Sequence, residues 1–199
     1  MNARYSAMAL GAVIFVGSIG YAATSAMFLN DAGPSAAPFA HTRFCLRYPA
    51  ECKVTGTDTG EKIDTAKNLK LSPDRRAQLE TVNTKVNREI IAQPQNDPPA
   101  AEQWVIKPAE GDCNDYAVTK RHDLIERGWP SDALLLTEVS LKSGEHHLVL
   151  VARTNEGDLI LDNLHQTIRT VAEANTDYKW VRMESERNPL YWSKVRLPS

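Results

Sequence analysis

The 199-residue sequence lacks any excess of basic side chains: 23 Lys and Arg stand against 25 Asp and Glu, for a formal net charge of −2. This balance argues against nucleic acid as the main partner, because little positive charge is available to neutralise phosphates. The sequence also lacks internal repeats, a sustained heptad pattern, and any CxxC or HxxxH spacing. With 42% hydrophobic and 24% charged residues, it has the composition and length of one globular domain.

The first 26 residues differ from the rest of the chain. They contain one charged residue, Arg4, then an apolar run over 7–23, then small residues up to Ala26. This order is typical of a secretory signal peptide, so we predict a signal over 1–26 and a periplasmic or secreted mature protein with no stable membrane partner. The alternative is an inner-membrane anchor formed by 7–23, although glycines interrupt that run.

Cysteine is scarce, with three residues in the whole chain. Cys45 and Cys52 lie seven positions apart in "FCLRYPAEC", with Pro49 between them to turn the chain. In an oxidising compartment such a pair is predicted to form a disulfide; two unpaired buried thiols are the alternative. This pairing leaves Cys113 as an unpaired thiol that is either buried and inert or kept for its reactivity.

The remaining sequence divides into a linker and a domain. Residues 27–40 are rich in Pro, Ala and Ser and predict a linker, followed by one domain over 41–199. Ser72 and Pro73 begin an amphipathic pattern that predicts a helix over 73–92. A second helix is expected from Asp112 to just before Gly128.

Strand-like apolar runs follow the second predicted helix. They cover 133–141, 146–153 and 158–164, and short turns between them favour antiparallel hairpins. Two further strands are expected in "YKWVRM" and "YWSKVRL" near the C-terminus. Helices followed by antiparallel strands indicate an α+β fold.

The predicted start of the second helix favours reactivity at Cys113. Asp112 is a natural N-cap, which places Cys113 in the first turn. The free backbone N–H groups and the positive end of the helix dipole favour a thiolate there and can also bind an oxyanion. A cysteine at a helix start can equally serve packing alone.

A base and an orienting acid are available on the predicted hairpin. A turn near 155–156 sets His147 opposite 163–164, within one or two residues of Asp162. We therefore predict a Cys113–His147–Asp162 triad, recognised by the roles of its members. The pattern alone leaves His146 and His147 undecided, and each of these residues also has a purely structural interpretation.

A metal site is the rival use of the same part of the sequence. The available ligands would be Cys113, His146, His147, His165 and Asp162. Without the ligand spacings common in structural zinc sites, this alternative has little support.

Three segments resemble one family. "GDCNDYAVTKRHDLIERG", "HHLVLVAR" and "GDLILDNL" are similar, in order and type, to motifs of the bacterial transglutaminase-like cysteine proteinases, which include LapG-type periplasmic proteases. "FCLRYPAEC" also resembles the N-terminal part of that family. The resemblance implies a papain-like, transglutaminase-like α+β core with the nucleophile at a helix N-terminus packed on an antiparallel sheet.

The resemblance also implies residue roles. Cys113 corresponds to the nucleophile, His147 to the base and Asp162 to the orienting acid, and the aliphatic run after the doublet selects His147. LapG-type members bind calcium through acidic residues flanking the cysteine. Here Asp112 matches, but Asn114 stands where a glutamate is expected. We therefore expect that no cofactor is required, with Asp112 and Asp115 as the ligands of any calcium.

These observations predict an exported cysteine peptidase that hydrolyses a peptide bond of a protein substrate, such as a cell-surface or periplasmic protein, through an acyl-enzyme. The oxyanion would be bound by the backbone N–H of Cys113 with a donor near Gln103 or Trp104. Two alternatives remain. The same triad could transfer the acyl group to an amine, or the fold could be a catalytically idle periplasmic binding module.

Overall fold

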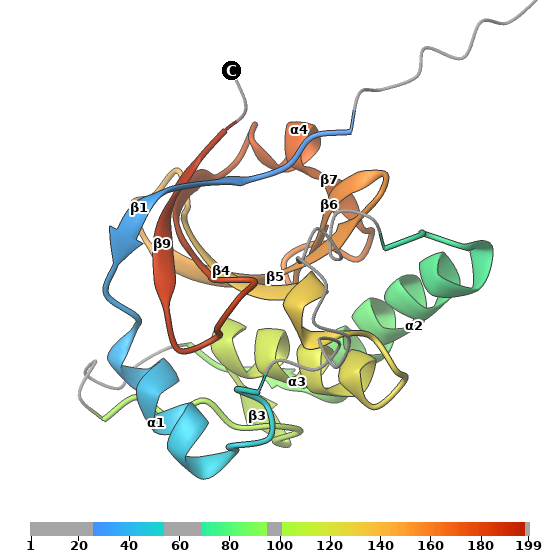
Figure 1. Cartoon of the computed structure of the whole chain (residues 1–199). Helices are drawn as coiled ribbons and strands as arrows, with labels where there is room; N and C mark the ends of the chain where they lie inside the picture. Colours follow the sequence, from blue (N-terminus) through green and yellow to red (C-terminus); the bar gives the residue numbers. More distant parts are fainter. Residues whose placement is uncertain (1–25, 54–68, 95–100, 198–199) are drawn as a thin grey trace, which may run out of the picture.

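The computed structural model describes residues 26–53, 69–94 and 101–197 (Figure 1). The predicted signal peptide, apart from Ala26, and the alternative anchor over 7–23 lie outside the described residues. Within the described ranges, none of the helices has both the length and the apolar character needed to cross a membrane.

The chain forms four α-helices and nine strands in its described parts. In order, these are β1 (Asn30–Ser35), α1 (Phe39–Arg47), α2 (Pro73–Glu89), β2 (Ile91–Ala92), β3 (Glu110–Gly111), α3 (Cys113–Ile125), the short 3-10 helix η1 (Ser131–Ala133), β4 (Leu134–Ser140), β5 (His146–Thr154), β6 (Gly157–Leu161), β7 (Arg169–Thr170), α4 (Val171–Ala174), β8 (Lys179–Glu184) and β9 (Trp192–Arg196). Seven strands form one antiparallel sheet in the order β1-β9-β8-β4-β5-β6-β7, and β2 pairs with β3 in parallel.

The large sheet is covered on both faces, which explains the continuous apolar runs of its central strands. Along β5, Leu148 and Leu150 belong to the core shared with the helices, whereas Val149 and Val151 belong to a second core. In Figure 1, α1, α2 and α3 lie on one side of the curved sheet, and α4 lies at the opposite side. The predicted α+β class and its helix-on-sheet arrangement are confirmed.

The helix predicted over 73–92 is α2, and its start follows the predicted capping. The hydroxyl of Ser72 accepts a hydrogen bond from the backbone N–H of Arg75 at 3.2 Å, and Pro73 is the first helical residue. The helix ends at Glu89, earlier than predicted, because β2 begins at Ile91 and pairs with β3.

The prediction of a linker over 27–40 differs from the structure. Residues 30–35 form β1, which pairs with β9 at the edge of the sheet, and α1 begins at Phe39. An edge strand needs hydrogen-bond donors on one side only, so it tolerates Pro34 beside a register shift between Asp31 and Pro34. A composition typical of a linker therefore also suits an edge strand.

The predicted disulfide between Cys45 and Cys52 is present, with an S–S distance of 1.99 Å. It closes the loop that follows α1, and Glu51 in that loop is held by α3. Buried Arg121 donates to the backbone carbonyl of Glu51, and the carboxylate of Glu51 lies 2.6 Å from Nδ1 of His122. The N-terminal part of the domain is thus fixed to the helix that carries the third cysteine.

Candidate active site

The start of α3 presents Cys113 as expected. Oδ1 of Asp112 accepts a hydrogen bond from the backbone N–H of Asn114 at 2.9 Å, and Oδ2 of Asp115 accepts from the N–H of Asp112 at 3.2 Å. This reciprocal capping box fixes the first turn, and Cys113 is the first helical residue.

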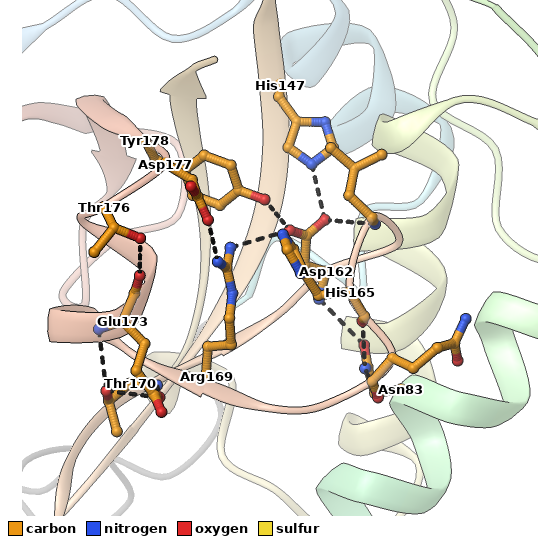
Figure 2. A network of polar contacts seen from close by, with 12 residues as sticks. Asn83, His147, Asp162, His165, Arg169, Thr170, Glu173, Thr176, Asp177 and Tyr178 are labelled. Atoms are coloured by element: carbon orange, nitrogen blue, oxygen red, sulfur yellow. Dashed lines mark hydrogen bonds and ion pairs between the residues drawn. The ribbon is translucent and has the colours of Figure 1, made fainter. Parts of the chain in front are cut away.

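The hairpin of β5 and β6 brings a histidine and an aspartate together. Leu150 pairs with Leu161, so Asp162 directly follows β6, near the start of β5. Nε2 of His147 lies 2.9 Å from Oδ1 of Asp162, and both side chains are buried (Figure 2). His146 instead is exposed and pairs with Glu138, so the structure distinguishes the two histidines.

Cys113 and His147 line the same cavity, which has a volume of about 630 Å³. Its wall also includes Trp104, Leu148 and Leu164. Because Nε2 of His147 is bound to Asp162, Nδ1 is the ring nitrogen left for the thiol. No hydrogen bond joins the thiol to His147 in the described part of the chain; in free enzymes such contacts commonly tighten only when substrate binds.

The surroundings of the Cys113 thiol oppose its ionisation. Burial raises its pKa to about 12, the negative charges of Asp112, Glu102 and Asp162 add to the effect, and a hydrogen bond from the backbone N–H of Leu148 acts against it. This differs from the expectation that the helix N-terminus favours a thiolate. The sequence showed the helix dipole but gave no measure of burial or of the carboxylate of Glu102.

Asp162 has the opposite environment. Burial alone would raise its pKa, but the hydrogen bond and charge of His147, the hydroxyl of Tyr178 and the backbone N–H of Leu164 lower it to about 2. The carboxylate is therefore ionised at neutral pH and available to stabilise a protonated His147.

Two asparagines of α2 hold the backbone of Asp162, and the sequence reasoning missed both. Oδ1 of Asn83 accepts from the N–H of Asp162 at 3.2 Å, and Nδ2 of Asn87 donates to its carbonyl at 2.9 Å. Asn83 also donates to the carbonyls of His165 and Gln166. The sequence did contain a signal for this contact: Asn83 and Asn87 are four residues apart, so their side-chain amides lie on the same face of the helix.

The two residues named for the oxyanion site have other contacts. The indole N–H of Trp104 lies in the cavity wall and donates to Glu102 at 2.7 Å. Gln103 is exposed, does not line the cavity, and its amide oxygen accepts from Arg47. The backbone N–H of Leu148, which the sequence did not single out, is the donor that reaches the sulfur.

Oxygen ligands for a hard cation gather beside Cys113. Nδ2 of Asn114 donates to Oε1 of Glu102 at 2.8 Å. The loop before α3 therefore supplies a carboxylate next to Asn114, the position at which the family motif has a glutamate. The predicted ligand Asp115 is placed differently, because its two oxygens accept the backbone N–H groups of Val105 and Asp112. Glu102, Asp112 and Asn114 therefore fit calcium better than Asp115 does.

The described residues contain one group of His, Cys, Asp and Glu side chains close enough to share a metal: His41, Cys45 and Cys52. Both cysteines are joined in the disulfide, so neither offers a thiolate. The zinc ligands considered from the sequence do not form such a group.

A half-buried Cys113 and His147 line one cavity, and Asp162 contacts His147; these are the residue types that cysteine peptidases use. The model of the family "bacterial transglutaminase-like cysteine proteinase BTLCP" matches residues 31–198. The chain belongs to this family of bacterial transglutaminase-like cysteine proteinases. No curated protein sequence matches the chain.

Solved structures of LapG from Legionella pneumophila are similar to the chain. The calcium-bound form is 31% identical, with 57% of this chain and 66% of that chain covered and a TM-score of 0.48. Another LapG structure is 29% identical over 74% of this chain and 83% of that chain, with a TM-score of 0.46. The expectation that no cofactor is required is wrong as stated, because it conflicts with the calcium-bound LapG structure.

Proposed function

We propose that the chain is an exported cysteine peptidase that hydrolyses a peptide bond of a protein substrate through Cys113, His147 and Asp162. The observation that carries this proposal is the 2.9 Å contact between His147 and Asp162 beside a cavity that Cys113 also lines. The family match supports peptidase chemistry and a protein substrate.

The reaction begins when the thiol proton of Cys113 passes to Nδ1 of His147. The thiolate attacks the substrate carbonyl carbon, and the backbone N–H groups at the start of α3 bind the oxyanion. The C–N bond then breaks as His147 returns its proton to the leaving amine, which leaves a thioester on Cys113. Asp162 keeps the imidazole oriented and stabilises its protonated form throughout.

Hydrolysis of the thioester completes the cycle. His147 removes a proton from water, the resulting hydroxide attacks the thioester carbonyl, and the C–S bond breaks as the thiol of Cys113 regains the proton. The products are a carboxylic acid and an amine. If a primary amine replaced water, the same residues would give an amide, which is the transferase alternative.

The test is hydrolysis of a proteome-derived peptide library, read by mass spectrometry, with calcium and with EGTA. We expect new termini with wild type and none with Cys113→Ala or His147→Ala, whereas His146→Ala retains hydrolysis as a matched control. Hydrolysis by Cys113→Ala equal to that of the wild type would contradict the assignment. Added methylamine would appear in the products if the enzyme were a transferase.

We also propose that Glu102, Asp112 and Asn114 hold calcium beside Cys113. The closeness of two carboxylates supports this proposal, since the charges of Asp112 and Glu102 both raise the pKa of Cys113 and that of Asp115. When bound, calcium would neutralise this negative charge and rigidify the first turn of α3. The other residues of the site keep the roles given above.

Calcium binding is tested by titration calorimetry and by thermal unfolding in CaCl₂, MgCl₂ and EGTA. At a hundredfold excess over Kd, calcium should stabilise the wild type by about 2.7 kcal/mol. Glu102→Gln should lose most of this gain, whereas Glu80→Gln, an exposed carboxylate on α2, should keep it. Equal stabilisation of both variants would reject Glu102 as a ligand.

We also propose that the chain is exported and that residues 1–26 are removed as a signal peptide. It is supported by the charge, apolar run and small residues at the N-terminus. The carbonyl of Met27 accepts a hydrogen bond from the N–H of Asp158 at 2.9 Å, so removal of the signal keeps the first contacts with the sheet. Intact-mass measurement on a periplasmic extract tests this: a mass starting at Met27 supports it, and full-length protein contradicts it.

One observation favours the idle binding module as a second candidate. With its pKa raised to about 12, the Cys113 thiol would be protonated and unreactive at neutral pH in the metal-free chain. Iodoacetamide labelling of Cys113 at pH 7.5, with and without calcium, separates the two functions. Rapid labelling with calcium that depends on His147 supports the peptidase, and labelling slower than in the unfolded chain, with and without calcium, supports the module.

A further inference from the structure

The second oxygen of the catalytic aspartate has contacts of its own. Oδ1 of Asp162 faces His147, whereas Oδ2 accepts a hydrogen bond from the hydroxyl of Tyr178 (Figure 2). Resting on the function proposed above, we propose that Tyr178 is a positioning residue of the triad. It fixes the carboxylate so that Oδ1 stays directed at His147.

Tyr178 is well placed to be a permanent donor. It lies in the turn between α4 and β8 and is 4% exposed. Burial raises the pKa of its hydroxyl, and the bond to Asp162 raises it further, so the phenol stays protonated in the working pH range. Its single proton goes to Oδ2, which leaves the lone pairs of Oδ1 to His147 and the backbone N–H of Leu164.

The backbone clamp from α2 leaves only the carboxylate free to turn. Asn83 and Asn87 hold the N–H and the carbonyl of Asp162, so the main chain at this residue is fixed. The remaining freedom is rotation about the side-chain bonds. A donor on Oδ2 removes this freedom, and Tyr178 supplies it.

A competing cation explains why this freedom matters. Nη2 of Arg169 lies 3.7 Å from Oδ2 of Asp162, beyond hydrogen-bond distance, while Nη1 pairs with Asp177 at 2.8 Å. The guanidinium lies 4.9 Å from the ring of Tyr178, and its Nε and Nη2 have no hydrogen-bond partner among the residues that the structure describes. Without the hydroxyl on Oδ2, Arg169 could bind the carboxylate with two N–H groups and turn Oδ1 away from His147.

Other charges around Asp162 do not replace this contact. The groups that face it and can carry a positive charge are His147 from β5, Arg169 from β7 and Lys120 from α3. Of these, only His147 forms a hydrogen bond with the carboxylate in the described structure. Among the described side chains that contact the carboxylate, Tyr178 is the neutral donor to Oδ2, and it restrains this oxygen without adding charge.

The test measures the pKa of the His147 imidazole by NMR on histidine-labelled protein in calcium buffer. Tyr178→Phe keeps the ring under Arg169 and removes only the hydroxyl. We expect a lower His147 pKa and a roughly tenfold lower kcat on the library peptide that the wild type cleaves fastest, with little change in KM. Tyr116→Phe, which removes another buried hydroxyl that donates to Ile90, is the matched control and should leave the His147 pKa unchanged.

Removing the competitor sharpens the test. Arg169→Gln added to Tyr178→Phe should recover part of the shift in the His147 pKa, because Arg169 then no longer draws Asp162 away, although Oδ2 still lacks the hydroxyl that fixed it. If Tyr178→Phe alone does not fold, the double variant is compared with Arg169→Gln and should show the lower His147 pKa. The proposal is overturned if loss of the hydroxyl moves this pKa no more than Tyr116→Phe does.

Asp162→Asn provides the reference that separates this proposal from the proposed function. A His147 pKa that drops in Asp162→Asn but not in Tyr178→Phe shows a His–Asp pair that does not need Tyr178. Absence of hydrolysis in the wild type, with the His147 pKa still sensitive to Tyr178, would count against the peptidase function and not against the positioning contact.

Discussion

The start of α3 and the end of β6 each hold a buried aspartate, yet the two behave in opposite ways. Burial, with Asp112 and Glu102 nearby, raises the pKa of Asp115 to about 6. Asp162 is even less exposed, but its pKa falls to about 2, because His147 and Tyr178 outweigh the effect of burial. Burial therefore does not decide the charge state here; the neighbours do.

The same contrast separates the two side chains that we propose react with substrate. Cys113 lies in the region crowded with carboxylates, and His147 lies in the region rich in donors and cations. A thiolate can form only if positive charge reaches the first region, from a proton on His147 or from a bound cation. The predictions below alter one region at a time.

The largest effect is expected from Asp162→Asn, which removes the charge from the second region. The neutral amide cannot stabilise a protonated His147, so hydrolysis should fall by about a thousandfold to ten-thousandfold. The measurement is kcat/KM on the best library peptide. Asp31→Asn, at the distant edge strand, is the control, and a loss of only a few-fold in Asp162→Asn would reject its place in the triad.

Asn83→Ala should have the next largest effect, because it removes the clamp on the backbone of Asp162. The loss of three hydrogen bonds, one buried and two partly buried, should lower the free energy of unfolding by about 2–4 kcal/mol and also lower kcat. Both are measured, by urea unfolding and by peptide hydrolysis. Val82→Ala, a cavity variant on the same helix, should lose stability and keep kcat; if both variants kept kcat, the clamp would be structural only.

Lys120 offers a pH-dependent test, because this buried lysine of α3 faces Asp162. Burial lowers its pKa to about 7 from 10.5, with Asp162 acting against the shift. At this residue the folded chain binds fewer protons than the unfolded chain between pH 7 and 10, so the contribution of Lys120 to stability should rise with pH across that window, whereas the raised pKa of Cys113 opposes the rise above about pH 9. Lys120→Met should remove this rise and increase stability at pH 7 by roughly 1–3 kcal/mol.

The measurement for Lys120 is urea unfolding at several pH values between 7 and 10. Lys179→Met, at an exposed position, should leave the pH dependence as it is in the wild type. An unchanged slope in Lys120→Met would show that another group titrates in this window.

The smallest effect is expected from Asn114→Glu, which adds a carboxylate to the first region. Calcium affinity should rise by roughly tenfold because the ligand charge increases. Without calcium, the same variant should unfold at a lower temperature, since another negative charge joins Glu102 and Asp112. Calorimetry and thermal unfolding measure the two effects, with Asn114→Gln as the neutral control; equal affinities in both variants would place calcium elsewhere.

Local signals in the sequence predicted much of the site. The cap at Asp112 placed Cys113 at a helix start, and the short turn between two apolar runs set Asp162 near His147. Both features depend on residues close together along the chain. The alternation along the strand left His146 and His147 undecided, and the structure shows His147 buried and His146 exposed.

Contacts between distant segments could not be predicted in this way. Asn83 reaches Asp162 across 79 positions, and Tyr178 reaches it from a turn that no local pattern marked as functional. Glu102 meets Asn114 from a loop whose path depends on how the rest of the chain packs. The edge strand β1 was missed because Pro and Gly are as compatible with an edge as with a linker.

The two hydrophobic cores of the sheet have a consequence for thermal inactivation. Cys113 packs against the core on the helical side, whereas Tyr178 belongs to the core on the other face. The proposed reaction would require both sets of side chains to be in place, so activity should stop when either core begins to loosen. The half-life of activity on heating would then report the stability of the weaker core. A substitution that stabilises only the stronger core would delay complete unfolding but would not lengthen the half-life of activity.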